Sequence, residues 1–247
     1  MGGDKLDNRG SGDARQAWPA IQRDGRKAAA IAGAGGGVLY LLGWTLLPAL
    51  LIGAAVIMVF VSRDPERVVP QGRQIILAPA DGRISRIEEV PVPPELGALL
   101  SGTGSPSALV VRVTIAMSVF GVQVCRSPVA GTIESALLIP ARTPAATLGL
   151  AGEAGEAQHL AVRMADGVAV GVSLFAGTPG QWMNAFVKSG DMLAAGQRIA
   201  IMRLGREVEL YLPQGTGSQV VLGQRVVAGE TRIAEVGATV FIEGLRH

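Results

Sequence analysis

The sequence has one cysteine, few aromatic side chains and little charge, and each scarcity excludes a class of protein. Cys125 alone cannot form an internal disulfide, which fits a reducing compartment. Aromatic residues make up 4% and charged residues 17% of the 247 positions, and the net charge is only +2. The stacking surfaces and basic stripes needed for nucleic-acid binding are therefore lacking. Metal-ligand spacings and phosphate-cradling loops are lacking as well.

The longest uncharged run covers residues 28–62 and consists largely of Ala, Gly, Leu and Val. As one continuous helix it would be about 52 Å long, against a bilayer hydrocarbon core of about 30 Å. A single strongly tilted span or a helical hairpin turning around residues 43–48 would fit this length. Because Pro48 interrupts the run and basic residues flank both ends, the hairpin or re-entrant arrangement is favoured. We therefore expect a hydrophobic helical anchor at residues 28–62.

The chain on either side of this run differs in charge and pattern. Residues 1–27 carry six basic and four acidic side chains and predict a flexible polar tail, whereas residues 63–247 carry 16 of each. A cleaved signal peptide is disfavoured, because the apolar run begins late, is too long and lacks a cleavage pattern after it. Beyond Arg63, short β-branched runs separated by Gly and Pro predict a mainly β domain over 63–247.

Two pairs of related segments sharpen the expected β fold. Residues 190–201 and 223–234 share a pattern with glycines six positions apart, and residues 79–84 and 128–133 share a Pro-x-x-Gly-x-Ile pattern. Glycines at this spacing allow tight turns with positive φ at both ends of a short strand. The pattern resembles the barrel-sandwich hybrid of biotinyl and lipoyl carriers. Lys188 lacks the sequence setting of their modified lysine and is expected to be an ordinary turn residue.

Four further motifs, in order and at family spacing, resemble those of the short, membrane-associated bacterial phosphatidylserine decarboxylases. They are FVSRDPER at 60–67, APADG at 78–82, MSVFGVQVCRSPVAG at 117–131 and GQRIAIMRLGREVELYLP at 196–213. The resemblance implies a precursor that cleaves itself at a Gly-Ser bond and forms a pyruvoyl group, with a His oriented by an Asp as the base. That group serves as an electron sink for decarboxylation. It also implies a role in phosphatidylethanolamine synthesis at the inner membrane, with the β domain on the cytoplasmic side.

Carried over position by position, the resemblance leaves only the acid in place. Asp81 matches the family's aspartate, but Gln123 stands at the histidine position. Arg206, which follows Gly205, stands at the position of the cleaved serine. An amide does not exchange a proton near neutral pH, and an arginine cannot become a pyruvoyl group. We therefore expect no pyruvoyl cofactor, no metal and no catalytic residue; Gln123 and Arg206 become candidate contacts for an anionic headgroup.

Other candidate groups have simpler interpretations. The Gly-Ser bonds at 104–105 and 217–218 lie in loops rich in Gly, Pro and Thr, where turn serines are expected. His159 fits a packed strand residue, and His247 is terminal. Cys125 fits a small buried apolar residue.

Three hypotheses of function remain. The first is a membrane-anchored, non-catalytic paralogue that binds phospholipid or a partner, such as an active homologue or a second copy of itself. The second is an active decarboxylase that matures by a non-standard route. The third and weakest is a membrane-fusion-type adaptor, which also joins an N-terminal anchor to a carrier-like barrel. Such adaptors contain a long helical hairpin in addition to the anchor, whereas long helical periodicity is absent here after residue 62.

Overall fold

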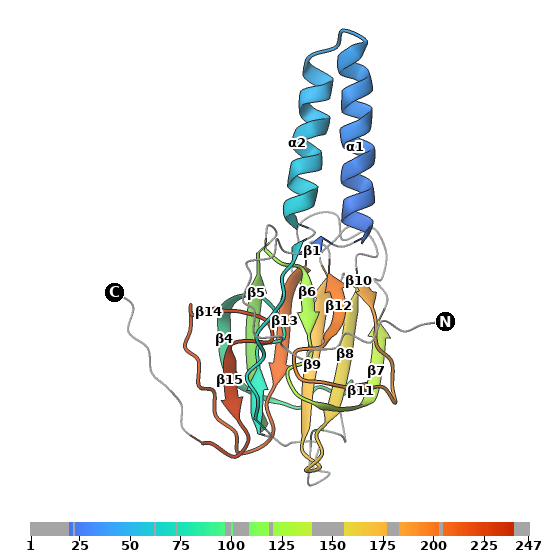
Figure 1. Cartoon of the computed structure of the whole chain (residues 1–247). Coiled ribbons are helices and arrows are strands. Elements are labelled where there is room, and N and C mark those ends of the chain that lie inside the picture. Colours follow the sequence, from blue (N-terminus) through green and yellow to red (C-terminus); the bar gives the residue numbers. More distant parts are fainter. Residues whose placement is uncertain are drawn as a thin grey trace.

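The protein consists of a helical hairpin that projects from one end of a β domain (Figure 1). The computed structural model describes residues 20–21, 23–61, 63–72, 74–96, 100, 109–118, 121–139, 156–176, 183–202 and 205–239. The hairpin helices are α1 (Arg23–Leu41) and α2 (Leu46–Val61), with the short pair β1 (Ala20–Ile21) and β2 (Arg63–Asp64) at their base. The mainly β class expected from the sequence is confirmed.

The turn of the hairpin follows from the way α1 ends. The amide of Trp44 donates to the carbonyl of Leu39 (3.2 Å), and the amide of Gly43 donates to the carbonyl of Tyr40 (3.0 Å). Gly43 has a φ of 86°, which side chains with a Cβ rarely adopt. This combination is a Schellman motif, and it reverses the chain directly after Leu41.

The sequence-based expectation that Pro48 interrupts the helix was wrong. The reversal lies at residues 42–45, and Pro48 is the third residue of α2. An amide in the first helical turn has no partner within the helix, so proline costs little there. The carbonyl of Thr45 already accepts from the amide of Ala49 (3.4 Å), which starts the helical pattern around Pro48.

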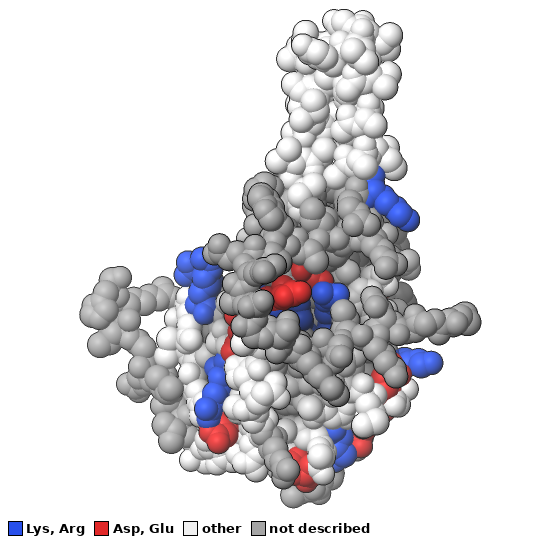
Figure 2. Space-filling model, viewed as in Figure 1, with Lys and Arg blue, Asp and Glu red and all other residues white. Residues whose placement is uncertain are grey.

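The two helices pack closely at Gly36. A Cβ at this position would lie 3.3 Å from Cγ1 of Ile52 and 3.4 Å from the carbonyl oxygen of Pro48. On the face seen in Figure 2 the hairpin is uncharged above its base, and Lys27 is exposed near the start of α1. In the described part of the chain, neither helix is both long enough and apolar enough to cross a membrane. A hairpin is therefore present, but the expected membrane-spanning anchor gains no support.

The β domain is built from antiparallel sheets around one main core. An eight-stranded sheet has the order β11-β7-β8-β9-β13-β5-β4-β14 and curls around the core, a three-stranded sheet has the order β10-β12-β6, and β15 pairs with β3. The strands are β3 (Ile75–Leu77), β4 (Gly82–Pro91), β5 (Leu109–Met117), β6 (Val124–Arg126), β7 (Gly131–Ile139), β8 (Ala157–Arg163), β9 (Ala169–Ala176), β10 (Met183–Ala185), β11 (Met192–Leu193), β12 (Arg198–Met202), β13 (Gly205–Tyr211), β14 (Arg225–Val226) and β15 (Arg232–Glu235). Alternate side chains point into the core, among them Ile115, Leu160, Leu174 and Leu210.

The related sequence segments occupy equivalent places in the fold. The amide of Leu77 donates to the carbonyl of Pro128 (2.9 Å), and the amide of Arg126 donates to the carbonyl of Pro79 (2.8 Å). These reciprocal bonds join the two Pro-x-x-Gly turns to each other. The repeated pattern in the sequence therefore corresponds to a two-fold internal relationship at the centre of the β domain.

The paired glycines of the second repeat have the predicted positive φ. The φ values are 90° at Gly190, 73° at Gly196, 82° at Gly223 and 74° at Gly229. A Cβ at Gly229 would lie 3.3 Å from the Cα of Gly196, so the two repeats also meet at these glycines. The finer assignment to a barrel-sandwich hybrid stays a prediction.

Candidate functional site

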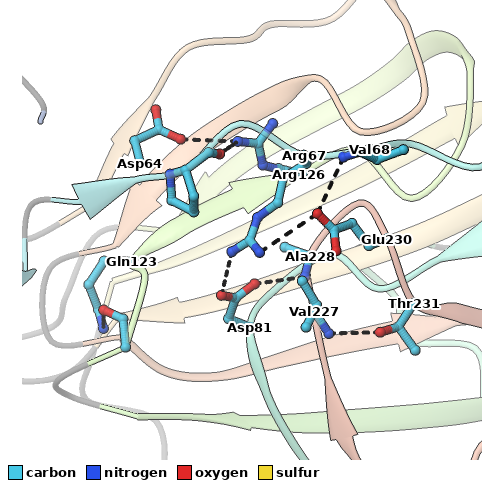
Figure 3. Close-up of polar contacts among 12 residues, drawn as sticks. Asp64, Arg67, Val68, Asp81, Gln123, Arg126, Val227, Ala228, Glu230 and Thr231 are labelled. Atoms are coloured by element: carbon cyan, nitrogen blue, oxygen red, sulfur yellow. Dashed lines mark hydrogen bonds and ion pairs between the residues drawn. The ribbon is translucent and has the colours of Figure 1, made fainter. Parts of the chain in front are cut away.

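The segment that connects α2 to the β domain is held by six charged residues, which we call the linker clasp: Asp64, Arg67, Asp81, Arg126, Arg198 and Glu230. Asp64 and Arg67 belong to the linker itself. Arg126 and Arg198 come from β6 and β12, whereas Asp81 and Glu230 lie in the turns before β4 and β15. Figure 3 shows the side chains of the clasp other than Arg198 converging from separate parts of the chain.

Asp64 is the buried acid of the clasp, with 5% of its surface exposed. Its Oδ1 accepts a hydrogen bond from the guanidinium of Arg126 (3.0 Å), and its Oδ2 lies 2.8 Å from Nε of Arg198. Arg126 is also buried and donates further to the carbonyls of Gly196 (3.0 Å) and Pro65 (3.1 Å). Burial lowers the pKa of Arg126, and Asp64 opposes that shift. The sequence motif DPER thus supplies the counter-charge for an arginine inside the β domain.

Asp81 is engaged by both of its carboxylate oxygens. Oδ2 accepts from the guanidinium of Arg67 (2.6 Å), and Oδ1 accepts from the amide of Ala228 (2.7 Å). The equivalent position in the other Pro-x-x-Gly turn is Ala130, so this turn does not require an acid for its backbone. Arg67 also lies 3.9 Å from Glu230. Asp81 therefore ties the linker to the turn that precedes β15.

Gln123 closes the loop between β5 and β6. Its Nε2 donates to the carbonyls of Ser118 (2.7 Å) and Gly121 (3.2 Å), and only 1% of the residue is exposed. Its own carbonyl accepts from the amide of Met202 (2.9 Å). Figure 3 shows Gln123 apart from Asp81, whose hydrogen bonds go to Arg67 and Ala228.

Gly205 and Arg206 form the start of β13. Figure 1 shows β13 running away from the hairpin, so these two residues lie at the hairpin end of the β domain. Gln123 reaches the same end, because its carbonyl bonds to Met202 at the end of β12. The side chain of Arg206 is 58% exposed and lies 3.8 Å from Glu207. The two candidate headgroup contacts thus share one end of the domain, with Arg206 accessible and Gln123 enclosed.

Cys125 follows Gln123 by two positions and is completely buried. Burial, reinforced by the negative charge of Asp81, raises the pKa of its thiol to about 12. Because the thiolate is the reactive form, this thiol is inert at neutral pH. It packs as the small apolar residue that the sequence predicts.

The remaining candidates also occupy structural positions. The hydroxyl of Ser218 is buried and bonds to the carbonyl of Val220 (3.2 Å), as in the predicted turn. Nδ1 of His159 lies 2.7 Å from Oγ of Ser173, inside the sheet face. Lys188 is exposed in a turn. Ser105 and His247 lie outside the described residues. Across the described ranges, no three His, Cys, Asp or Glu side chains are grouped so that they could hold a metal ion.

Sequence reasoning missed the roles of Arg67 and Arg126. The two motifs that contain them, at 60–67 and 117–131, were recognised only as family patterns. A sequence signal did exist, because a strand as buried as β6 ends in an arginine that needs a counter-charge. Which acid supplies that charge depends on the folded chain.

Comparison with known proteins identifies the class to which this fold and site belong. Residues 55–234 match the family model of phosphatidylserine decarboxylase. The chain is 42% identical over 249 aligned residues to the phosphatidylserine decarboxylase proenzyme of Erythrobacter litoralis, with 99% of each chain covered. It is 43% identical to the proenzyme of Novosphingobium aromaticivorans, with 99% of this chain and 98% of the relative covered. No solved structure matches the chain. The chain belongs to the phosphatidylserine decarboxylase family.

Proposed function

We propose that this chain is a member of the phosphatidylserine decarboxylase family that does not cleave itself and acts at the phospholipid membrane as a single uncleaved chain. The observation that carries the proposal is Arg206, which follows Gly205 where the family resemblance places the cleaved serine. Self-cleavage to a pyruvoyl group requires a side-chain hydroxyl at that position. A guanidinium offers neither a nucleophile nor an atom that could become the pyruvoyl carbonyl.

The residues at the other two family positions support this proposal. At the histidine position, the amide of Gln123 is used in bonds to the carbonyls of Ser118 and Gly121. The retained acid, Asp81, is bound by Arg67 and by the amide of Ala228. A carboxylate in that arrangement stabilises the linker clasp. The hydrogen bonds of Asp81 and Gln123 therefore give both residues a structural role that does not require catalysis.

The proposed role is the binding of phospholipid at the cytoplasmic face of the inner membrane. The exposed apolar hairpin would hold the chain at the bilayer, and the exposed Arg206 lies at the hairpin end of the β domain. A guanidinium is well suited to a phosphate or carboxylate headgroup. In this role the chain would also bind a protein partner that takes part in phosphatidylethanolamine synthesis, either an active homologue or a second copy of itself.

The second candidate is an active decarboxylase that matures at another bond. It is favoured by the names of the relatives, which are called proenzymes at 42% and 43% identity over almost the whole chain. Such a route would need another serine. Within the described residues, the Gly-Ser bond at 217–218 has a buried hydroxyl that bonds to Val220.

Intact-mass spectrometry of the purified full-length protein separates the two candidates. We expect one species at the mass of the complete chain, 25.4 kDa. Two fragments, one of them with a pyruvoyl terminus, would refute the proposal and support the active enzyme.

Lipid binding is tested separately by co-sedimentation with vesicles that contain phosphatidylglycerol. Arg206→Gln should weaken binding, whereas Arg163→Gln should not. Arg163 is a suitable control because it lies at the opposite end of the sheet. Ala157, at the other end of β8, pairs with Phe175, which pairs in turn with Glu207 beside Arg206. Equal binding by both variants would remove Arg206 as a headgroup contact.

A further inference from the structure

The hairpin exposes apolar side chains on almost all of its surface. In α2 only Pro48, Leu51 and Ala55 are shielded within residues 46–56, which is the stripe that faces α1. Exposed fractions reach 85% at Leu41 and 81% at Leu46. The large exposed apolar residues of the hairpin are Ile31, Val38, Tyr40, Leu41, Leu42, Trp44, Leu46, Leu47, Leu50, Ile52 and Val56. A helix that is apolar all round belongs in an apolar environment on every side.

The tip of the hairpin pairs the backbone donors that end α1, whereas the amides of Thr45, Leu46 and Leu47 at the start of α2 have no backbone acceptor. The amides of Leu42, Gly43 and Trp44 all donate to carbonyls of the last turn of α1. Pro48 has no amide proton, and the amide of Ala49 donates to Thr45. In hydrocarbon each unpaired backbone donor costs several kcal/mol. Proline at this position and the Schellman motif before it therefore lower the cost of placing the turn where there is no water.

The hairpin is too short to reach the far side of a bilayer. Its α2 has 16 residues and is about 24 Å long, and the uncharged part of α1, residues 28–41, is about 21 Å long. A hydrocarbon core is about 30 Å thick, so one leaflet contributes about 15 Å. A hairpin of this length passes the midplane and stops before the opposite headgroups.

We propose that the hairpin inserts into the bilayer from one side only, with its tip at residues 42–47 in the hydrocarbon and both of its ends on the side of the β domain. This inference rests on the proposed membrane role and adds its topology. The linker clasp supports it, because buried ion pairs of Asp64 attach the end of α2 directly to the β domain. Lys27 is exposed near the start of α1, at the base of the hairpin, where its positive charge can contact anionic headgroups.

The observations favour lipid over a second copy of the chain as the occupant. A partner copy would cover one side of the hairpin, and a dimer interface would leave the opposite apolar side in water. The exposed residues instead surround α2 except on the stripe that faces α1. Lipid is the environment that covers all of these directions at once.

The natural chain suits a cysteine-accessibility experiment, because its single thiol, Cys125, is buried and inert. Single cysteines are introduced by Trp44→Cys at the tip, Lys27→Cys at the base and Leu222→Cys in the β domain, where Leu222 is 53% exposed. Each full-length variant is added to sealed vesicles of phosphatidylcholine and phosphatidylglycerol. A membrane-impermeant maleimide is supplied either outside the vesicles or enclosed within them. Leu46→Cys repeats the tip measurement without removing the indole.

We expect the tip cysteines to stay unlabelled from both sides until detergent is added, and the other two to be labelled from outside only. Labelling of a tip cysteine from the lumen would mean that the hairpin spans the bilayer, and labelling from outside would mean that it does not insert. If the tip cysteines become labelled when the ratio of protein to lipid is lowered, a second copy of the chain, and not lipid, had shielded them. Each of these three results overturns the proposal. Intact mass of the same samples reports on self-cleavage independently, so the two proposals can fail separately.

Discussion

Replacing Asp64 by asparagine tests whether the linker clasp stabilises the protein as a buried ion pair. The substitution keeps the shape of the side chain and removes its charge. Arg126 then keeps its bonds to the carbonyls of Gly196 and Pro65, but its charge has no buried counter-ion. Arg198 is less affected, since 31% of its side chain is exposed to water.

The expected loss follows from these contacts. Removing one partner of a buried ion pair costs about 3–5 kcal/mol, and the two carbonyl bonds that remain to Arg126 place Asp64→Asn near the lower end, about 3 kcal/mol. For a chain of this size each kcal/mol lowers Tm by about 2–4 °C. The melting temperature should therefore fall by about 6–12 °C, measured by circular dichroism of the β domain in a constant detergent or lipid background.

Glu134→Gln supplies a matched control, because it removes a carboxylate that pairs with Arg163 where 37% of the Arg163 side chain and 29% of the Glu134 side chain are exposed. Exposed pairs contribute about 0–1 kcal/mol, so this variant should change Tm by at most about 4 °C. Combining Asp64→Asn with Arg126→Met should cost less than the sum of the single losses, because the buried guanidinium of Arg126 is no longer there to be left unpaired, and Arg198 is partly exposed to water. A loss for Asp64→Asn no larger than that for Glu134→Gln would refute the reasoning.

In the folded protein the thiol of Cys125 should not react with maleimide at neutral pH, because burial raises its pKa to about 12, and it should react once the chain is unfolded; native-state reaction would contradict its burial. The free energy of unfolding should fall as pH decreases below 6.5, the ordinary pKa of histidine, because burial lowers the pKa of His159 and the unfolded chain then takes up a proton that the folded chain does not. The stability that depends on neutral His159 is fully present above the pKa of the unfolded chain and is lost as pH falls through the lower pKa of the folded protein. Denaturant titrations of His159→Asn should not show this pH-dependent loss. A pH profile identical to that of the unsubstituted protein would contradict the role of His159. Gln123→His combined with Arg206→Ser should produce cleavage after Gly205, seen as two fragments by intact mass, because together they restore a base and a hydroxyl. Neither single variant should cleave; cleavage without the serine would contradict the positional argument.

Much of the fold could be predicted from local sequence patterns. Short β-branched runs between Gly and Pro predicted the β domain, and glycines six apart predicted positive φ at Gly190, Gly196, Gly223 and Gly229. These features depend on interactions between neighbours in the sequence. The position of the hairpin turn was only approximate, because a proline is compatible with the first turn of a helix as well as with a break.

The candidate site was predicted less completely, because its contacts join distant segments. Asp64 and Arg126 are 62 positions apart, and Asp81 and the amide of Ala228 are 147 apart. The sequence identified Asp81 through its motif but could not show that Arg67 binds it. It also paired Gln123 with Arg206 as headgroup contacts, whereas the structure encloses the first and exposes the second.

The sequence by itself determined the class of the protein and the absence of a hydroxyl at position 206, because both depend only on which residues stand in which order. It also determined that residues 28–62 carry no charge. Only the tertiary structure decided that this run forms two short helices, and that the linker after them is held by Asp64 and Arg67. Those facts depend on the pairing of charges inside a folded β domain, where the cost of burying an arginine selects the acid that must lie beside it.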